Sequence, residues 1–260
     1  MRTLPALTKP AAILSFDFDG TLHDPASSPP VPPELFELIQ RIRETHQASW
    51  GINTGRSMVH MIEGFLESRF PFLPDWVVAR EREIYIPNKF GRWVAHAPWN
   101  KQCEKEILRL FKRAKKLLAR IRHDIEEHTG AQWIDMEGEP AGIISRTVEE
   151  MEWIVSRIAP LAGEEPHLSW QRNSIYLRFG HRDFHKGSSL TEVARLHQLT
   201  AANCFAIGDS HNDLNMLDSN HAGMTACPAN SVPEIHAKVS ASGGLITQGI
   251  HAHGAIEALK

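Results

Sequence analysis

The stretch that decides the fold is Ala11-Ala-Ile-Leu-Ser-Phe-Asp-Phe-Asp-Gly-Thr21. Its first six residues are almost all apolar, which is typical of a short strand that is buried on both faces of a sheet. Two carboxylates, Asp17 and Asp19, stand two residues apart where this strand ends, so both can face the same crevice. Gly20 lets the chain turn away tightly. This pattern predicts the first strand of a parallel α/β sheet, whose functional side chains follow the carboxyl ends of the strands.

Beyond this stretch, helical and strand patterns alternate. Apolar residues at helical spacing predict one helix from about Pro33 and another from about Met58. The short apolar runs Ala48 to Asn53 and Trp76 to Ala79 predict two further strands. Such alternation is typical of a Rossmann-like, doubly wound parallel sheet, and we therefore expect an α/β fold.

The middle of the chain has a different pattern. A small hairpin is predicted over 83–95, followed by a long amphipathic helix from about Lys101 to His128. Short strands and one more helix, over 148–159, complete this region. Strands of antiparallel type with two helices predict an inserted α/β domain, which we place at residues 82–183.

The parallel pattern resumes after the insertion. Lys186 precedes a helix, and Cys204 to Ile207 is a further apolar strand, after which we expect a short helix over 214–219. These elements complete the sheet that the N-terminal part begins. We therefore expect a discontinuous core domain made of residues 1–81 and 184–260.

Composition excludes several classes of protein. The 260 residues include 28 Lys and Arg against 31 Asp and Glu, and this net charge of -3 provides no bulk positive field for a nucleic acid or an anionic membrane. The three cysteines are odd in number and widely spaced, which argues against a disulfide framework. No apolar run approaches the ~20 residues that span a bilayer. We expect a cytoplasmic protein with no nucleic-acid or membrane partner.

The 15 histidines raise the question of a metal site. Their closest groupings are His181-x-x-x-His185 and His251-x-His253, and no H-E-x-x-H motif is present. Zinc needs three or four converging ligands, and the spacing indicates no such set. We therefore expect these histidines to be solvated or incidental.

Residues whose side chains or backbone N–H groups can take part in chemistry recur at the ends of the predicted strands and at one helix start. They are Asp17, Asp19, Thr54, Gly55, Lys186, Asp209 and Asp213. Each has an ordinary explanation when taken singly, as a cap, a loop residue or a solvated lysine. Closely spaced carboxylates, however, repel one another and need a cation, and Mg²⁺ prefers oxygen ligands and commonly bridges carboxylates to a phosphate. Together they predict a site for Mg²⁺ and a phosphate group.

These segments resemble the four signature motifs of the haloacid dehalogenase superfamily of phosphohydrolases. The motifs are Asp17-Phe-Asp-Gly-Thr21, Thr54-Gly-Arg56, Lys186-Gly187 and Gly208-Asp-Ser-His-Asn-Asp213. The insertion between the second and third motifs is similar to the α/β (type C2) cap of the Cof-like and sucrose-phosphatase-like branch. One segment departs from the pattern: Cof-like members usually have Asn-Gly-Ala after the third strand, and this chain has Arg80-Glu-Arg-Glu83. The departure leaves the substrate preference open.

The resemblance implies a Mg²⁺-dependent phosphatase that acts on a small phosphorylated metabolite, with a sugar phosphate as the first candidate. Asp17 is then the nucleophile that forms an aspartyl-phosphate, and Asp19 is the general acid and base. Asp17, the main chain of Asp19 and Asp209 are the expected Mg²⁺ ligands, and Asp213 is expected to orient them. A phosphomutase or phosphotransferase of the same superfamily, and a binding protein that keeps the fold without turnover, are the alternatives.

The resemblance also implies which residues hold the substrate. Thr54, Gly55, Lys186 and Asn212 are the expected phosphate-binding residues, and Arg56 is a candidate substrate contact. Further candidates for substrate contacts are Arg80, Arg82, Arg172, Asn173 and Arg178. Each of these is more often a member of a surface ion pair than a ligand.

Overall fold

The computed structural model describes residues 2–5, 7, 9–136 and 139–260, and it divides into two compact units. The first unit is Met1–Asn100 with Lys186–Lys260, and the second is Lys101–His185. Residues 82–100, which we predicted to belong to the insertion, therefore lie in the first unit. The reason is strand pairing, because the hairpin in this segment extends the large sheet of the first unit.

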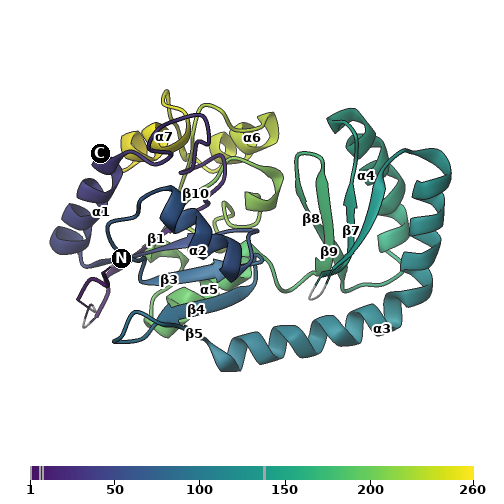
Figure 1. Cartoon of the computed structure of the whole chain (residues 1–260), viewed down its shortest axis with the longest axis horizontal. Helices are drawn as coiled ribbons and strands as arrows, with labels where there is room; N and C mark the ends of the chain where they lie inside the picture. The colour runs from purple at the N-terminus through teal and green to yellow at the C-terminus, as the bar shows by residue number, and fades with distance from the viewer. Residues whose placement is uncertain (1, 6, 8, 137–138) are drawn as a thin grey trace. The chain divides into compact units, whose positions relative to one another are not determined.

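That sheet has, among the described residues, eight strands in the order β12-β11-β10-β1-β2-β3-β4-β5 (Figure 1). The strands are β1 (Ala12–Phe16), β2 (Ala48–Asn53), β3 (Trp76–Ala79), β4 (Glu83–Pro87), β5 (Trp93–Ala95), β10 (Cys204–Ile207), β11 (Met224–Cys227) and β12 (Leu245–Ile246). Pairing is parallel from β12 to β3 and antiparallel from β3 to β5. The predicted α/β fold with a mainly parallel sheet is confirmed.

Helices cover both faces of this sheet. The helices are α1 (Pro33–His46), α2 (Met58–Glu67), α5 (Lys186–Leu196), α6 (Pro233–Ala241) and α7 (His251–Ala258). Successive side chains of a strand point to opposite faces, so Leu14 and Phe16 of β1 join the core under α1, α2 and α7, whereas Ile13 joins the core under α5 and α6. The buried strand at the centre thus has apolar partners on each side, as its continuous apolar run predicts.

One sequence prediction in this unit is wrong. Residues 214–219, expected to form a short helix, are turns that follow a single 3₁₀ turn over His211–Asp213. The Ser210 hydroxyl and the Asp213 carboxylate cap this turn reciprocally. The capping favours a tight turn over a continuing α-helix, and it fixes the Asp213 side chain at the start of the segment.

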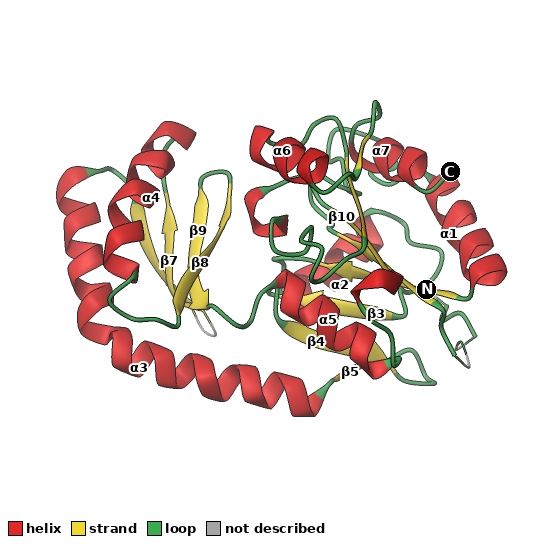
Figure 2. Cartoon of the chain, turned by 180° about the vertical axis from the view of Figure 1, so that it is seen from behind, coloured by secondary structure: helices red, strands yellow, loops and turns green. Residues whose placement is uncertain are grey.

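The second unit is an antiparallel sheet covered by helices on one face (Figure 2). Its strand order is β6-β7-β9-β8. The elements are α3 (Ala97–His128), β6 (Gln132–Met136), β7 (Glu139–Ile144), α4 (Val148–Ala162), β8 (Leu168–Asn173) and β9 (Tyr176–His181). The apolar stripe predicted along α3 is buried at Ile107, Ala114, Leu118, Ile121 and Ile125, and α3 itself begins in the first unit.

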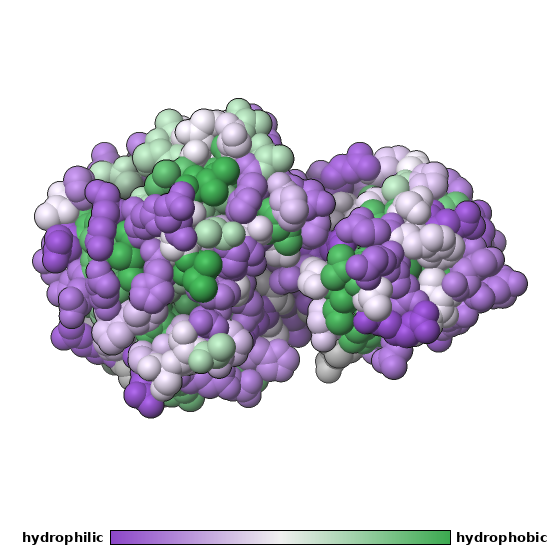
Figure 3. All heavy atoms as spheres, turned by 90° about the horizontal axis from the view of Figure 1, so that it is seen from above, coloured by the Kyte–Doolittle hydropathy of each residue, from purple (hydrophilic) through white to green (hydrophobic). Residues whose placement is uncertain are grey.

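The face drawn in Figure 3 is mainly hydrophilic. On this face, hydrophobic residues lie in small separate patches between hydrophilic ones. Within the described ranges, no helix combines the length and the apolar character that a membrane crossing needs.

Candidate active site

The carboxyl ends of β10, β1 and β2 bring the predicted residues together. These three strands are neighbours in the sheet, and Asp209, Asp17 and Thr54 follow them closely. The backbone N–H of Asp17 donates to the Ile207 carbonyl at 3.0 Å, which prolongs the β1–β10 pairing up to the first carboxylate. A parallel sheet therefore places side chains from three distant segments at one edge.

Lys186 is the central cation of this site. It is the first residue of α5, it is fully buried, and its Nζ lies 2.6 Å from Asp17 Oδ1 and 2.7 Å from Asp213 Oδ1. Burial by itself lowers the pKa of a lysine, but the charges of Asp17 and Asp213 outweigh burial and raise the pKa of Lys186 well above its ordinary value. The ammonium group therefore remains charged between two buried carboxylates.

The carboxylates nevertheless outnumber this cation. Burial, and then the neighbouring charge of Asp213, raise the pKa of Asp17 well above its ordinary value and raise that of Asp209 to about 6. Carboxylate oxygens of Asp17, Asp209 and Asp213 lie within 4.8 Å of one another. A set of converging oxygen donors with unbalanced negative charge fits a hard divalent cation such as Mg²⁺.

Asp213 is fully engaged by the protein. Its Oδ1 accepts from Lys186, and its Oδ2 accepts the backbone N–H groups of Asp209 and Ser210, both at 3.0 Å. Its side chain thus holds the loop that carries Asp209. Thr21, which we did not predict, fixes the same residue from the other side, since its hydroxyl donates to Asp209 Oδ1 at 2.7 Å.

Asp19 is held by Arg56. The guanidinium group donates from Nε and Nη2 to the two Asp19 oxygens at 2.8 and 2.6 Å, and it lies over the Phe18 ring at 4.8 Å. The Asp19 side chain is 42% exposed, unlike the buried Asp17. Arg56, predicted as a substrate contact, therefore orients Asp19 in this structure. Its backbone N–H also donates to the Thr54 hydroxyl.

Two predicted phosphate-binding residues, Asn212 and Gly55, lie next to the carboxylate of Glu81, which the sequence analysis did not identify. Asn212 Nδ2 donates to Glu81 Oε1 at 2.9 Å, and the same oxygen lies 3.4 Å from the point that a Cβ on Gly55 would occupy. Glu81 is only 5% exposed. The signal that could have found it is the segment Arg80-Glu-Arg-Glu83, where the chain departs from the Cof-like pattern.

The remaining candidates for substrate contacts lie after β3 and in the second unit. Arg80 pairs with Glu83 at 3.3 Å, and Arg82 donates to the Arg80 carbonyl. In the second unit, the buried Arg172 pairs with Glu152 at 2.6 Å. Asn173 ends β8 and Arg178 lies within β9. None of these contacts assigns any of the five residues to a substrate.

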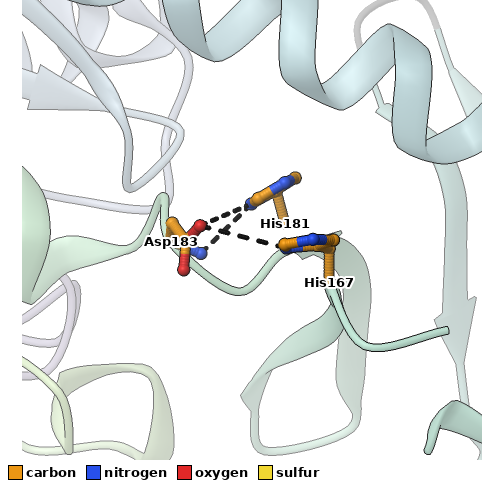
Figure 4. A group of neighbouring side chains, drawn as sticks. All are labelled: His167, His181 and Asp183. Atoms are coloured by element: carbon orange, nitrogen blue, oxygen red, sulfur yellow. Dashed lines mark hydrogen bonds and ion pairs between the residues drawn. The ribbon is translucent and has the colours of Figure 1, made fainter.

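Two histidines and an aspartate form a separate group in the second unit (Figure 4). Nδ1 of His167 and of His181 lie 4.0 and 3.8 Å from Asp183 Oδ2, and the two rings stack. The sequence indicated no such set, because His167 and His181 approach each other only through the β8–β9 pairing. His181 Nδ1 already accepts the Asp183 backbone N–H at 3.2 Å. Its lone pair therefore stabilises the turn after β9.

The model of the haloacid dehalogenase-like hydrolase family matches residues 74–259. The chain belongs to this family. The superfamily resemblance that the four motifs predicted is thus confirmed, although Asp17 and Thr54 precede the matched range. No curated protein sequence matches the chain.

Solved structures with this fold cover nearly the whole chain. Sucrose-phosphatase from Synechocystis, solved with sucrose and phosphate, matches with a TM-score of 0.73 at 15% identity, over 96% of this chain and 97% of that one. A haloacid dehalogenase-like hydrolase from B. subtilis matches at 0.66 and 17% identity, over 95% and 98%. A protein from Bacteroides thetaiotaomicron, described among phosphatases of the haloalkanoate superfamily, matches at 0.64 and 17% identity, over 98% and 96%. These likenesses show the fold.

Proposed function

We propose that this protein is a phosphatase that hydrolyses a small phosphorylated metabolite, with a sugar phosphate as the first candidate, through an aspartyl-phosphate on Asp17. The observation that carries the proposal is the buried Asp17–Lys186–Asp213 ion triad at the strand ends, beside Asp209. Family membership supports hydrolysis. The sucrose and phosphate bound to the sucrose-phosphatase of the same fold support the substrate class.

The chemistry follows from the roles of three side chains. A carboxylate oxygen of Asp17 attacks phosphorus, the bond from phosphorus to the ester oxygen breaks, and Asp19 gives its proton to the leaving alkoxide. Asp19 then takes a proton from water, which attacks the aspartyl-phosphate and releases inorganic phosphate and free Asp17. Lys186 keeps one Asp17 oxygen in place during both steps, because its ammonium group is locked between two carboxylates.

Phosphate recognition is proposed for the turn after β2 and for the loop after β10. Thr54 and Gly55 lie at the strand end, and Asn212 presents its amide donor from the 3₁₀ turn. Mg²⁺, held by Asp17, Asp209 and the main chain of Asp19, would supply positive charge that offsets the nucleophile and the phosphate. Asp213 and Thr21 keep Asp209 oriented for that role.

A panel of phosphate esters tests the proposal. Wild-type protein with Mg²⁺ is expected to release phosphate from at least one small ester, and Asp17→Asn is expected to lose at least ~1,000-fold in kcat, because the nucleophile is gone. Asp218→Asn, a change of the same type in an aspartate that pairs with Lys238, serves as the control and should keep its activity. Equal turnover of the wild-type and Asp17→Asn proteins contradicts the proposal. Added acceptor sugars that capture the phosphate in preference to water identify a phosphotransferase.

A further inference from the structure

Glu81 is a buried acid in a position where an anion is expected to bind. Its Oε1 accepts from Asn212 Nδ2 at 2.9 Å and lies close to Gly55, and both of these residues are assigned above to phosphate. The mechanism uses no carboxylate at this point. Its charge also acts on Lys186, where it adds to the effects of Asp17 and Asp213 in raising the pKa of the lysine.

The backbone that carries the Glu81 side chain is in a strained conformation. Arg80 and Glu81 have φ angles of 48° and 65°, so two consecutive residues with side chains occupy the left-handed region that favours glycine. Tertiary contacts fix this conformation: the Glu81 N–H donates to the Thr54 carbonyl at 2.9 Å, and the Glu81 carbonyl accepts from the Ser189 hydroxyl at 3.2 Å. Strain of this kind persists only where the surroundings over-determine it, and it is concentrated at functional sites.

A carboxylate and a phosphate present similar oxygen acceptors to an amide donor, and they repel each other. We propose that Glu81 is an internal competitor for the phosphate site: its carboxylate takes an N–H donor of the Asn212 amide and places a like charge there, and it must be displaced before a phosphoryl group binds. This inference rests on the proposed function. In that role Glu81 weakens the binding of free phosphate, and a substrate overcomes it with binding energy from its leaving group.

Binding of inorganic phosphate, measured by titration calorimetry with Mg²⁺ present, tests this role independently of turnover. Glu81→Gln removes the charge and keeps an oxygen that can accept from Asn212, whereas Glu81→Gly also empties the space and suits the left-handed backbone. We expect the Kd of phosphate to fall about tenfold in Glu81→Gln, and further in Glu81→Gly, because the like charge is gone. Glu83→Gln, the same change two residues away on a side chain bonded to Arg80 and Tyr85, should change the Kd less than about twofold.

Each result bears on a different conclusion. If Glu81 only positions Asn212, Glu81→Gly binds phosphate more weakly than the wild type and Glu81→Gln binds it equally, which overturns the inference. Identical Kd values in all the variants overturn the inference as well, while Asp17-dependent turnover leaves the phosphatase intact. If no variant binds phosphate and Asp17→Asn leaves turnover unchanged, both the inference about Glu81 and the proposed phosphatase function are overturned.

Discussion

The buried ion triad of the first unit and the arginine–acid pairs on the surface of the second unit have opposite surroundings. In the first unit, Lys186 and Asp213 are completely buried, and Lys186 donates hydrogen bonds to both Asp213 and Asp17. In the second unit, apart from the buried Arg172, several charged residues pair at the surface, such as Arg157 with Asp124, where the arginine side chain is 51% exposed. The same types of residue are therefore placed in two very different dielectric environments.

The pKa shifts of the acids follow these surroundings. Burial and like charges raise the pKa of Asp17 and Asp209 in the first unit. Hydrogen bonds from arginines lower the pKa of Asp124 and Glu150 in the second unit. A raised pKa means that the folded protein disfavours the ionised acid, so the first unit holds negative charge that a cation can neutralise. The surface pairs of the second unit hold no such excess and contribute modest stability.

Removing the buried cation should give the largest effect. Lys186→Met leaves Asp17 and Asp213 facing each other without compensation, and we expect a loss of about 3–5 kcal/mol in the free energy of unfolding. Arg120→Met, which breaks an exposed pair with Glu164, should change the free energy of unfolding far less, because solvent screens exposed charges. Urea unfolding at pH 7 measures both. Equal losses in the two variants would show that burial does not separate these charges energetically.

A glycine comparison should give the next effect. A Cβ on Gly208 would lie 2.3 Å from Asp213 Cγ, whereas a Cβ on Gly180 in β9 would meet no atom within 4 Å. Gly208→Ala should therefore destabilise the protein by about 1–3 kcal/mol through overpacking. Gly180→Ala should change the unfolding free energy by no more than about 0.5 kcal/mol. Urea unfolding curves of the two variants measure both changes. An unchanged free energy of unfolding in Gly208→Ala would contradict the tight packing at Asp213.

Magnesium should stabilise the wild-type protein through the first unit. At a Mg²⁺ concentration ten times Kd, binding contributes about 1.4 kcal/mol, a rise of roughly 2–4 °C in Tm. The rise should be larger at pH 8 than at pH 5, because Asp209, whose pKa is raised to about 6, is protonated at pH 5 and binds cations poorly. Differential scanning fluorimetry reads this shift. Asp209→Asn should abolish the Mg²⁺-dependent rise in Tm, and Asp124→Asn should keep it. A rise that persists in Asp209→Asn and is lost in Asp124→Asn would place the cation outside the proposed site.

The smallest effect should come from an acid of the second unit that pairs with an exposed arginine. Hydrogen bonds from Arg146 lower the pKa of Glu150 to about 2, from an ordinary value of 4.5. An acid with a lowered pKa contributes stability above pH 4.5 that is lost as the pH falls towards 2. Glu150→Gln should therefore show a shallower fall of the urea midpoint over this pH range than the wild type. Exposed Glu104→Gln is the control for net charge, and it should follow the wild type.

Local patterns predicted much of the fold and the site, because both depend on features that are close in the sequence. Apolar runs and helical spacing identified the parallel sheet, and polar residues at strand ends and at one helix start predicted that Asp17, Thr54, Lys186 and Asp209 belong to one site. The helix predicted over 214–219 failed for a local reason as well, since the reciprocal cap of Ser210 and Asp213 closes a tight turn. The sequence pattern did not distinguish this turn from the start of a helix.

The sequence alone determined which reactive groups follow one another along the chain. They are an acidic pair, a hydroxyl, a lysine and a second acidic pair, and each lies in a short motif of adjacent residues. The tertiary structure decided which partners they have. Pairing of the 83–95 hairpin with β3 moved that segment into the first unit, and the contact between Glu81 and Asn212 joins residues 131 positions apart. Strand pairing and left-handed backbone at Arg80 and Glu81 are set by contacts between distant segments, and periodicity along the chain carries no record of them.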